Sequence, residues 1–310
     1  MEMGIGVMRA GLWKPRTRPG CFEGVGERGL EWLLEAARET GIKVCTEVGS
    51  AAHARAALDA GLALVWIGAR TTANPFQVQE IADALQGSDI PVLVKNPVSP
   101  DADLWAGAIE RLSQGGRNKV AAVLRGFTTL EKGHYRNNPV WEIAGRIEAR
   151  FPGLTIFADP SHIGGNIKYV AEISQRALDL GFDSLMIEAH PNQSQALSDA
   201  AQQLSFPQLK DLLGSLRPRR AGEEVSLMLE ELRSEIDSID SRLLTLLASR
   251  MEISSKIGLL KKENNIPILQ SGRWETLLAR LKEDASAAGL DPAMVERIFN
   301  VIHEYSLKEQ

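Results

Sequence analysis

One imidazole and two carboxylates stand at positions in the sequence where catalytic side chains are often found. His162 follows the apolar run 154–157, Glu188 follows the apolar run 184–187, and Asp199 lies at the start of the next predicted helix. In a parallel α/β barrel, the carboxyl ends of the strands form the catalytic edge. Nitrogen and oxygen ligands of this kind could bind a divalent transition metal. The alternative is that Asp199 caps a helix and that the other two are ordinary loop residues.

Basic residues recur at the ends of the predicted strands. Taken singly, each could be a surface residue in a loop, but bases at successive strand ends would converge on one mouth. Crowded like charges are costly unless anions neutralise them. The sequence therefore predicts substrates that carry phosphate and carboxylate groups. The basic residues are Arg9, Lys14, Arg16, Arg70, Lys95 and Arg125.

The elements that must position these side chains alternate between strands and helices up to about residue 213. Strands of nearly continuous apolar character, each followed by an amphipathic helix, favour a parallel sheet covered by helices. A closed (β/α)8 barrel needs eight such units, and this region contains seven. We therefore expect either an open sheet or a TIM-type barrel without its first βα unit. The predicted strands are 5–9, 43–48, 63–68, 91–95, 120–124, 154–158 and 183–188, and the predicted helices are 27–40, 51–60, 75–86, 101–114, 138–150, 168–180 and 203–213.

Length, charge and cysteine content narrow the class of protein. The 310 residues predict about two domains, and a net charge of −5 argues against nucleic acid as the main partner. No apolar run approaches the roughly 18 residues of a membrane span, and the N-terminus has no signal-peptide pattern. The two cysteines, Cys21 and Cys45, show no metal-type pairing. We therefore expect a cytoplasmic protein with reduced thiols.

The strand-end segments together resemble the type I class of 3-deoxy-D-arabino-heptulosonate 7-phosphate (DAHP) synthase, the first enzyme of the shikimate pathway. The resemblance spans residues 9–213 and implies an aldol-like condensation of phosphoenolpyruvate with erythrose 4-phosphate. It also implies a divalent metal, Mn²⁺ or a similar ion, which polarises the aldehyde or activates water. The matching segments are Arg9 with Lys14-Pro15-Arg16-Thr17, Gly68-Ala69-Arg70, Val94-Lys95-Asn96, Leu124-Arg125-Gly126, Asp159-Pro160-Ser161-His162, Glu188-Ala189-His190-Pro191 and Leu197-Ser198-Asp199.

The resemblance assigns a role to each of these side chains. A basic cluster holds phosphoenolpyruvate and stabilises the developing negative charge, with two of its lysines as catalytic residues. A second group holds the phosphate of erythrose 4-phosphate, and a third binds the metal. The cluster is Arg9, Lys14, Arg70, Lys95 and Arg125, with Lys14 and Lys95 catalytic; the second group is Arg16 and Thr17; the metal ligands are His162, Glu188 and Asp199.

One segment of the family pattern has no counterpart in this sequence. The family has a Gly-Pro-Cys-Ser type segment after its first strand, and its cysteine is the fourth metal ligand. Neither Cys21, in a loop, nor Cys45, inside a strand, occupies that position. The first βα unit is either lost or encoded upstream of the start of this sequence. We accordingly expect weak or no synthase activity, and an upstream strand that ends in Gly-Pro-Cys.

The C-terminal third is helical. Apolar residues recur at alternating spacings of three and four from Leu229 to Leu260, which predicts one long helix with a heptad-like seam. Arg250 interrupts this seam, and a buried guanidinium needs an anion. Lys261 returns to nearly the same face of the helix. The alternative is that Arg250 reaches solvent or pairs with a carboxylate of another helix.

This region resembles the all-helical class of chorismate mutase, which rearranges chorismate to prephenate without a cofactor. The resemblance implies that arginines grip the two carboxylates and that Lys261 and Gln310 act at the ether oxygen. It also implies a homodimer through the C-terminal domain, since about 85 residues cannot bury the seam alone. Acidic residues of the family's commonest pattern are replaced by Gln270 and Trp274. The substrate-binding residues are Arg233, Arg250, Gln270, Arg273 and Ser306.

We therefore predict three parts: a synthase-like barrel (1–213), a linker (214–224) and a chorismate mutase domain (225–310). The favoured function is a bifunctional enzyme of the shikimate pathway, with phosphoenolpyruvate, erythrose 4-phosphate and chorismate as substrates. The alternative is a chorismate mutase that carries a non-catalytic, regulatory or truncated barrel remnant. A complete basic cluster favours the first function, and the absent cysteine favours the second.

Overall fold

The computed structural model describes residues 3–16, 19–113, 119–130, 133–219, 223–267 and 271–309. Three residues named above, Thr17, Gln270 and Gln310, lie outside these ranges. The chain divides into two compact units, Met1–Arg219 and Arg220–Gln310.

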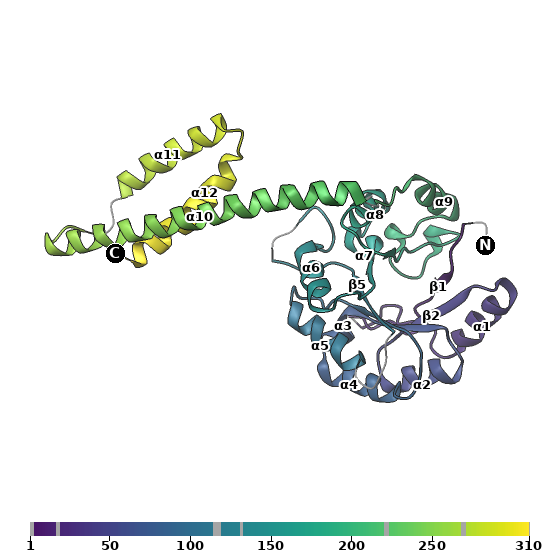
Figure 1. The fold of residues 1–310 in the computed structure, drawn as a ribbon. Coiled ribbons are helices and arrows are strands. Elements are labelled where there is room, and N and C mark those ends of the chain that lie inside the picture. Colours follow the sequence, from purple (N-terminus) through teal and green to yellow (C-terminus); the bar gives the residue numbers. More distant parts are fainter. Residues whose placement is uncertain are drawn as a thin grey trace. The chain divides into compact units, whose positions relative to one another are not determined.

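Seven strands of the first unit form one parallel sheet in which each strand pairs with the next in sequence (Figure 1). The predicted strands are therefore confirmed, although the two edge strands are shorter than expected. An edge strand forms backbone hydrogen bonds with one neighbour only, so its length is limited to the residues that pair with that neighbour. Among the described residues no ladder joins the first strand to the last, and the sheet is open there. The strands are β1 (Val7–Arg9), β2 (Lys43–Val48), β3 (Leu64–Ile67), β4 (Val92–Lys95), β5 (Val120–Leu124), β6 (Ile156–Ala158) and β7 (Ser184–Leu185).

Helices pack on one face of this sheet and short turns lie at its carboxyl edge (Figure 1). The predicted helices are present with ends that differ by a few residues. The long ones are α1 (Arg28–Thr40), α2 (Ala51–Asp59), α4 (Pro75–Ala84), α5 (Ala102–Ser113), α6 (Trp141–Arg150), α8 (Val170–Asp179) and α9 (Phe206–Ser215). The short ones are α3 (Ala69–Thr72), α7 (Pro160–Gly164), η1 (Ile167–Tyr169), η2 (Gln193–Gln195) and η3 (Ala200–Gln202).

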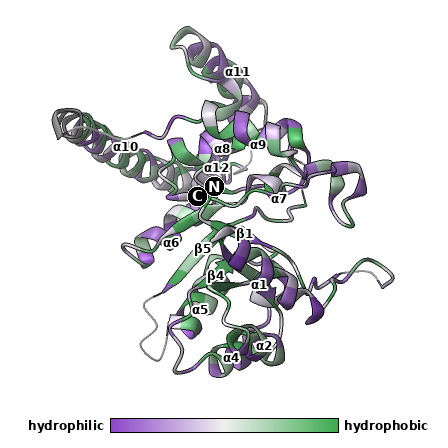
Figure 2. Cartoon of the chain, turned by 90° about the vertical axis from the view of Figure 1, so that its right-hand side faces the viewer, coloured by the Kyte–Doolittle hydropathy of each residue, from purple (hydrophilic) through white to green (hydrophobic). Residues whose placement is uncertain are grey.

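The alternation of side chains along each strand produces two separate apolar layers. On β2, Val44 and Val48 join the large core between the sheet and the helices. Cys45 points the other way and joins Trp66 and Leu93 in a smaller cluster inside the curved sheet. Because both faces are apolar, the strands carry the near-continuous hydrophobic pattern of a buried parallel sheet, as the colouring of β4 and β5 shows (Figure 2).

The second unit consists of three helices, α10 (Glu223–Glu263), α11 (Ser271–Ala287) and α12 (Pro292–Lys308). Asp291 caps α12 by accepting a hydrogen bond from the Ala293 N–H, with a proline at the first helical position. The apolar seam of α10 remains exposed: the side chains of Ile236, Leu246 and Leu260 are each more than half accessible. Within the described ranges, no helix is both long enough and apolar enough to cross a membrane.

Candidate functional sites

The carboxyl ends of the strands surround one cavity of about 1170 Å³. Most of the barrel residues predicted from the sequence line it, because parallel strands present their carboxyl ends at a common edge. Arg125 is not among the lining residues; its Nη1 donates to Asn137 Oδ1 at 3.1 Å, and burial lowers the pKa of its guanidinium to about 10. The predicted residues that line the cavity are Arg9, Lys14, Arg16, Arg70, Lys95, His162, Glu188 and Asp199.

A buried carboxylate at the end of β6 organises one side of this site. Asp159 is inaccessible to solvent, and its Oδ2 lies 2.7 Å from Lys95 Nζ. Its Oδ1 accepts from the His162 N–H at 3.1 Å and lies 3.0 Å from His162 Nδ1. Burial alone would raise the pKa of Asp159, but His162 and Lys95 outweigh it and hold that pKa well below its usual range. Asp159 therefore stays charged, neutralises Lys95 and orients the imidazole.

Glu188, which follows the neighbouring strand β7, forms a second centre of the site. Its carboxylate pairs with Arg9 and accepts hydrogen bonds from Gln202 Nε2 at 2.7 Å and Gln203 Nε2 at 3.2 Å. Burial would raise the pKa of Glu188, but Arg9 and then His162 lower it to about 2. The carboxylate is thus ionised at neutral pH and is held by Arg9 and the two glutamines.

Two of the three predicted metal ligands lie close together. His162 Nε2 is 3.9 Å from Glu188 Oε1, and Nδ1 is already held by Asp159, so Nε2 faces the carboxylate. Two donors at about 2.1 Å from one ion cannot be more than about 4.2 Å apart, so this pair fits a divalent metal. The third predicted ligand does not join them: the described residues contain no group of three or more His, Cys, Asp or Glu side chains that could hold a metal ion.

Asp199 instead bridges two arginines. Its Oδ2 lies 3.6 Å from Arg16 Nη1 and its Oδ1 accepts from Arg136 Nη1 at 3.1 Å. Arg136 also donates to Gln202 Oε1 at 3.1 Å, which links this group to Glu188. Asp199 stands at the N-cap position of η3, but its side chain makes no capping hydrogen bond, so the alternative in which this side chain caps the helix is wrong. The arrangement places the two guanidinium groups where a second anion could bind.

Tertiary contacts reveal residues that the sequence analysis did not assign to the site. Glu47 Oε2 accepts from Trp66 Nε1 at 3.2 Å, and the guanidinium of Arg9 lies 5.3 Å from the centre of the Trp66 ring. Asp159 and Arg136 were likewise unassigned, although Asp159 stands in a segment quoted for the family resemblance. Glu47 and Asp159 could have been recognised only by their positions at strand ends. Their partners are distant in the chain, so no local pattern marks them.

Gly68 is required where Glu47 approaches the chain after β3. A Cβ at this position would lie 2.0 Å from Glu47 Oε1. We expect Gly68→Ala to displace the carboxylate from Trp66 and to cost about 1–3 kcal/mol of unfolding free energy. Gly107→Ala in α5, where a Cβ meets nothing within 4 Å, should be neutral or stabilising by about 0.5–1 kcal/mol. Urea midpoints measure both; equal shifts for the two variants would contradict the assignment.

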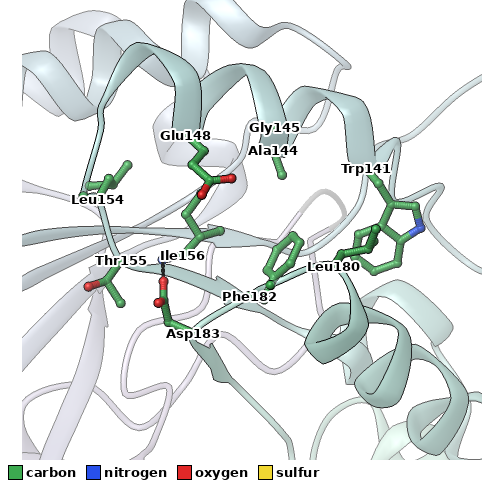
Figure 3. Close-up of a pocket in the computed structure, with 12 residues that line it drawn as sticks. Trp141, Ala144, Gly145, Glu148, Leu154, Thr155, Ile156, Leu180, Phe182 and Asp183 are labelled. Carbon is green, nitrogen blue, oxygen red and sulfur yellow. Dashed lines mark hydrogen bonds between the residues drawn. The ribbon is translucent and has the colours of Figure 1, made fainter. Parts of the chain in front are cut away.

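A second, smaller cavity of about 260 Å³ lies at the amino ends of β6 and β7, away from the site (Figure 3). Trp141 and Phe182 pack edge to face at 5.6 Å, and Glu148 points toward the space they enclose. Asp183 already accepts from the Ile156 N–H at 2.7 Å. Because Glu148 is exposed and Asp183 is engaged by the backbone, this cavity is a surface hollow in which neither acidic group indicates a ligand.

In the second unit, Arg250 meets Ser306. The hydroxyl of Ser306 accepts from Arg250 Nη1 and donates to the Ile302 carbonyl at 2.8 Å. Ser306 is buried and Arg250 half-buried, and burial lowers the pKa of the Arg250 guanidinium. The structure thus brings together two of the predicted substrate-binding residues. Arg273 lies exposed on α11, and Arg233 is exposed on α10.

Both parts of the chain match known families. Residues 4–217 match the model of the DAHP synthetase I family, and residues 232–310 match that of chorismate mutase type II. The first match spans nearly the whole first unit, so the barrel is substantial, and the alternative of a barrel remnant is wrong in that respect.

Individual relatives agree with this division. The phospho-2-dehydro-3-deoxyheptonate aldolase of Thermotoga maritima is 34% identical over 217 residues, which cover 70% of this chain and 62% of that protein. Its crystal structure matches with a TM-score of 0.61 and 31% identity, covering 69% of this chain and 60% of the other. The T-protein of Enterobacter agglomerans is 37% identical over 70 residues, 23% of this chain and 19% of that protein. The chain thus spans less than two thirds of these relatives.

Proposed function

The chain belongs to the DAHP synthetase I family, and from this premise we propose that its first unit condenses phosphoenolpyruvate with erythrose 4-phosphate to DAHP. We propose further that its second unit rearranges chorismate to prephenate, so that the protein is a bifunctional shikimate-pathway enzyme. The observation that carries the first proposal is the convergence of basic side chains and ionised carboxylates on one cavity. The domains would be 1–213 and 225–310, joined by the linker 214–224.

The basic side chains divide into two anion sites. Arg9, Lys14 and Lys95 line the cavity and would hold phosphoenolpyruvate, with Arg70 at its phosphate. We propose the same phosphate contact for Arg125, although its Nη1 donates to Asn137 in this structure. Burial lowers the pKa of both Lys14 and Lys95, so their protons are more readily given to a developing oxyanion. Arg16 and Thr17 would hold the phosphate of erythrose 4-phosphate.

We propose that Mn²⁺ or a similar divalent ion binds at His162 and Glu188. Asp199, which pairs with Arg16 and Arg136 in this structure, would have to leave these arginines to serve as the third ligand. A bound ion would polarise the aldehyde carbonyl of the sugar phosphate. The chain's own contribution is to orient the imidazole through Asp159 and to keep the carboxylate of Glu188 ionised. Both cysteines of the chain are free, which supports a cytoplasmic location, where thiols stay reduced.

In the second unit, Arg250 would grip one carboxylate of chorismate, positioned by Ser306, with Arg273 nearby, while Lys261 and Gln310 would act at the ether oxygen. Gln270 would complete the polar lining. Arg233 cannot reach the same site from its own helix: at about 1.5 Å per residue it lies roughly 25 Å from Arg250 along α10. We therefore propose a homodimer in which the exposed seam of α10 is covered and Arg233 serves the site of the partner subunit.

The synthase proposal is tested on the full chain with phosphoenolpyruvate, erythrose 4-phosphate and added Mn²⁺. We expect only slow consumption of phosphoenolpyruvate, because the cysteine segment of the family pattern is absent, and this consumption should depend on the sugar phosphate and stop with a chelator. His162→Ala should weaken Mn²⁺ binding at least about tenfold, measured by the electron paramagnetic resonance of free Mn²⁺. His134→Ala, an exposed imidazole, is the matched control. Tight Mn²⁺ binding that survives His162→Ala would contradict the metal assignment.

A further inference from the structure

Two aromatic rings from different helices stack face to face in the second unit. Trp274 on α11 and His303 on α12 have ring centroids 3.9 Å apart and planes inclined by 5°. Both side chains are half-buried. A ring stacked in this way keeps its plane, and its two nitrogens point outward from the edge of the stack. The indole therefore fixes the plane in which His303 can form hydrogen bonds.

This imidazole lies beside the Arg250 and Ser306 pair. His303 is almost one helical turn before Ser306 on α12. Arg250 and Lys261 on α10 are the charged groups that act on the imidazole. Helix α11 contacts it through the uncharged indole of Trp274, which follows the exposed Arg273 in the sequence. On its own helix, the neighbouring Glu304 pairs outward with Lys308 at 2.7 Å. No carboxylate among these groups favours the protonated ring.

The charge state of His303 follows from this setting. Burial, then Arg250 and Lys261, lower the pKa of the imidazole from its ordinary value of 6.5. At neutral pH the ring is therefore uncharged, with one nitrogen that donates and one that accepts. A neutral ring beside the two cations can accept a hydrogen bond, whereas a protonated ring could only donate.

The described polar groups around His303 mainly donate hydrogen bonds. Arg250 and Lys261 can only donate hydrogen bonds. The hydroxyl of Ser306 already accepts from Arg250 and donates to the Ile302 carbonyl. These groups suit the carboxylates and ether oxygen of chorismate, which are acceptors. The ring hydroxyl of chorismate has a different need, because its hydrogen requires an acceptor when the hydroxyl leaves water.

We propose that His303 is a specificity-determining residue of the rearrangement site, where its neutral imidazole accepts a hydrogen bond from the ring hydroxyl of chorismate and Trp274 holds the imidazole plane. This assignment rests on the proposed mutase function. It gives Trp274 a positioning role and His303 a direct contact with the substrate.

The first experiment compares chorismate with an analogue that lacks the ring hydroxyl, using the full chain. We expect the wild type to prefer chorismate by at least about tenfold in kcat/KM, because the analogue leaves the imidazole without its partner. His303→Leu should reduce this preference to near unity, whereas His303→Gln, which retains an acceptor, should keep most of it. An unchanged preference in His303→Leu would overturn the proposal.

The tryptophan is tested with a matched pair. Trp274→Phe keeps an aromatic face for the imidazole and should preserve the preference for the hydroxyl. Trp274→Ala should lower the preference, because it reduces kcat/KM for chorismate more than kcat/KM for the hydroxyl-free analogue. Circular dichroism confirms that the helices remain folded. Loss of turnover on both substrates to the same extent, in a folded Trp274→Ala variant, would contradict the positioning role.

The pH profile supplies a readout that a purely structural role would not move. As the pH falls through the lowered pKa of His303, the accepting nitrogen becomes protonated, so kcat/KM for chorismate should fall on the acidic side of the profile. His303→Gln should lack this acidic limb. Persistence of the limb in His303→Gln would assign it to another group and overturn the proposal.

Failure of this inference can be told apart from failure of the proposed function. A wild type that does not turn over chorismate at any pH overturns the mutase function, and this inference with it. A wild type that turns over chorismate, and whose discrimination is unaffected by His303→Leu, overturns the inference alone.

Discussion

Arg250→Ala will lower kcat/KM for chorismate rearrangement by at least about 10²–10³-fold, an effect of about 3–4 kcal/mol on the barrier. The guanidinium is the donor fork that a carboxylate binds in bidentate fashion, and a smaller side chain leaves that charge without a partner. The same change frees the buried Ser306, which then loses its charged donor. Initial rates of chorismate loss, followed by absorbance, measure the effect.

The matched control for this variant is Arg280→Ala. Arg280 lies on the surface of α11, where it pairs with Asp284 at 3.7 Å with both side chains about two thirds exposed. Exposed pairs of this kind contribute little, so we expect nearly wild-type rates. Arg250→Lys keeps the charge but loses the bidentate donor geometry, so we expect a rate between those of Arg250→Ala and the wild type. Full activity in Arg250→Ala would overturn the site in the second unit.

Lys95→Met will destabilise the first unit by about 3–5 kcal/mol and abolish phosphoenolpyruvate binding. The substitution removes the ammonium group 2.7 Å from Asp159 and leaves that inaccessible carboxylate uncompensated. Asp159 also accepts from His162, so we expect the imidazole to retain a proton to higher pH in the variant. The loss of stability therefore comes from the orphaned partner as much as from the missing lysine.

Urea unfolding of the full chain measures this loss if the signal reports on the first unit alone. Trp274 is the one tryptophan of the six in the sequence that lies beyond residue 219, so a Trp274→Phe background confines tryptophan fluorescence to the first unit. The double variant Lys95→Met/Asp159→Asn removes both charges and should be less destabilised than Lys95→Met alone. A double variant that is as unstable as the sum of the two single variants would contradict a coupled pair.

The charge pairs of the site in the first unit join residues that are far apart in the sequence, so no local sequence pattern predicts them. Asp159 and Lys95 are 64 residues apart, and Arg9 and Glu188 are 179 apart. Nothing in the local pattern around Asp199 signals that two arginines bind it. The sequence predicted that these groups lie at one edge of a sheet. It did not predict the pairing of each carboxylate with its base, because that pairing depends on distances that are set only in the folded structure.

By itself, the sequence determined the seven strands, the helices between them and the long C-terminal helix. These follow from local periodicity and from caps such as Asp291 with Pro292, where each residue's preference depends on its neighbours. Tertiary structure alone decided that Glu188 is bound by Arg9 and two glutamines, that Asp199 pairs with Arg16, and that Trp274 stacks on His303. The reason is physical: these interactions join groups from different strands, loops or helices, and their strength depends on burial and separation, which arise only when the elements pack.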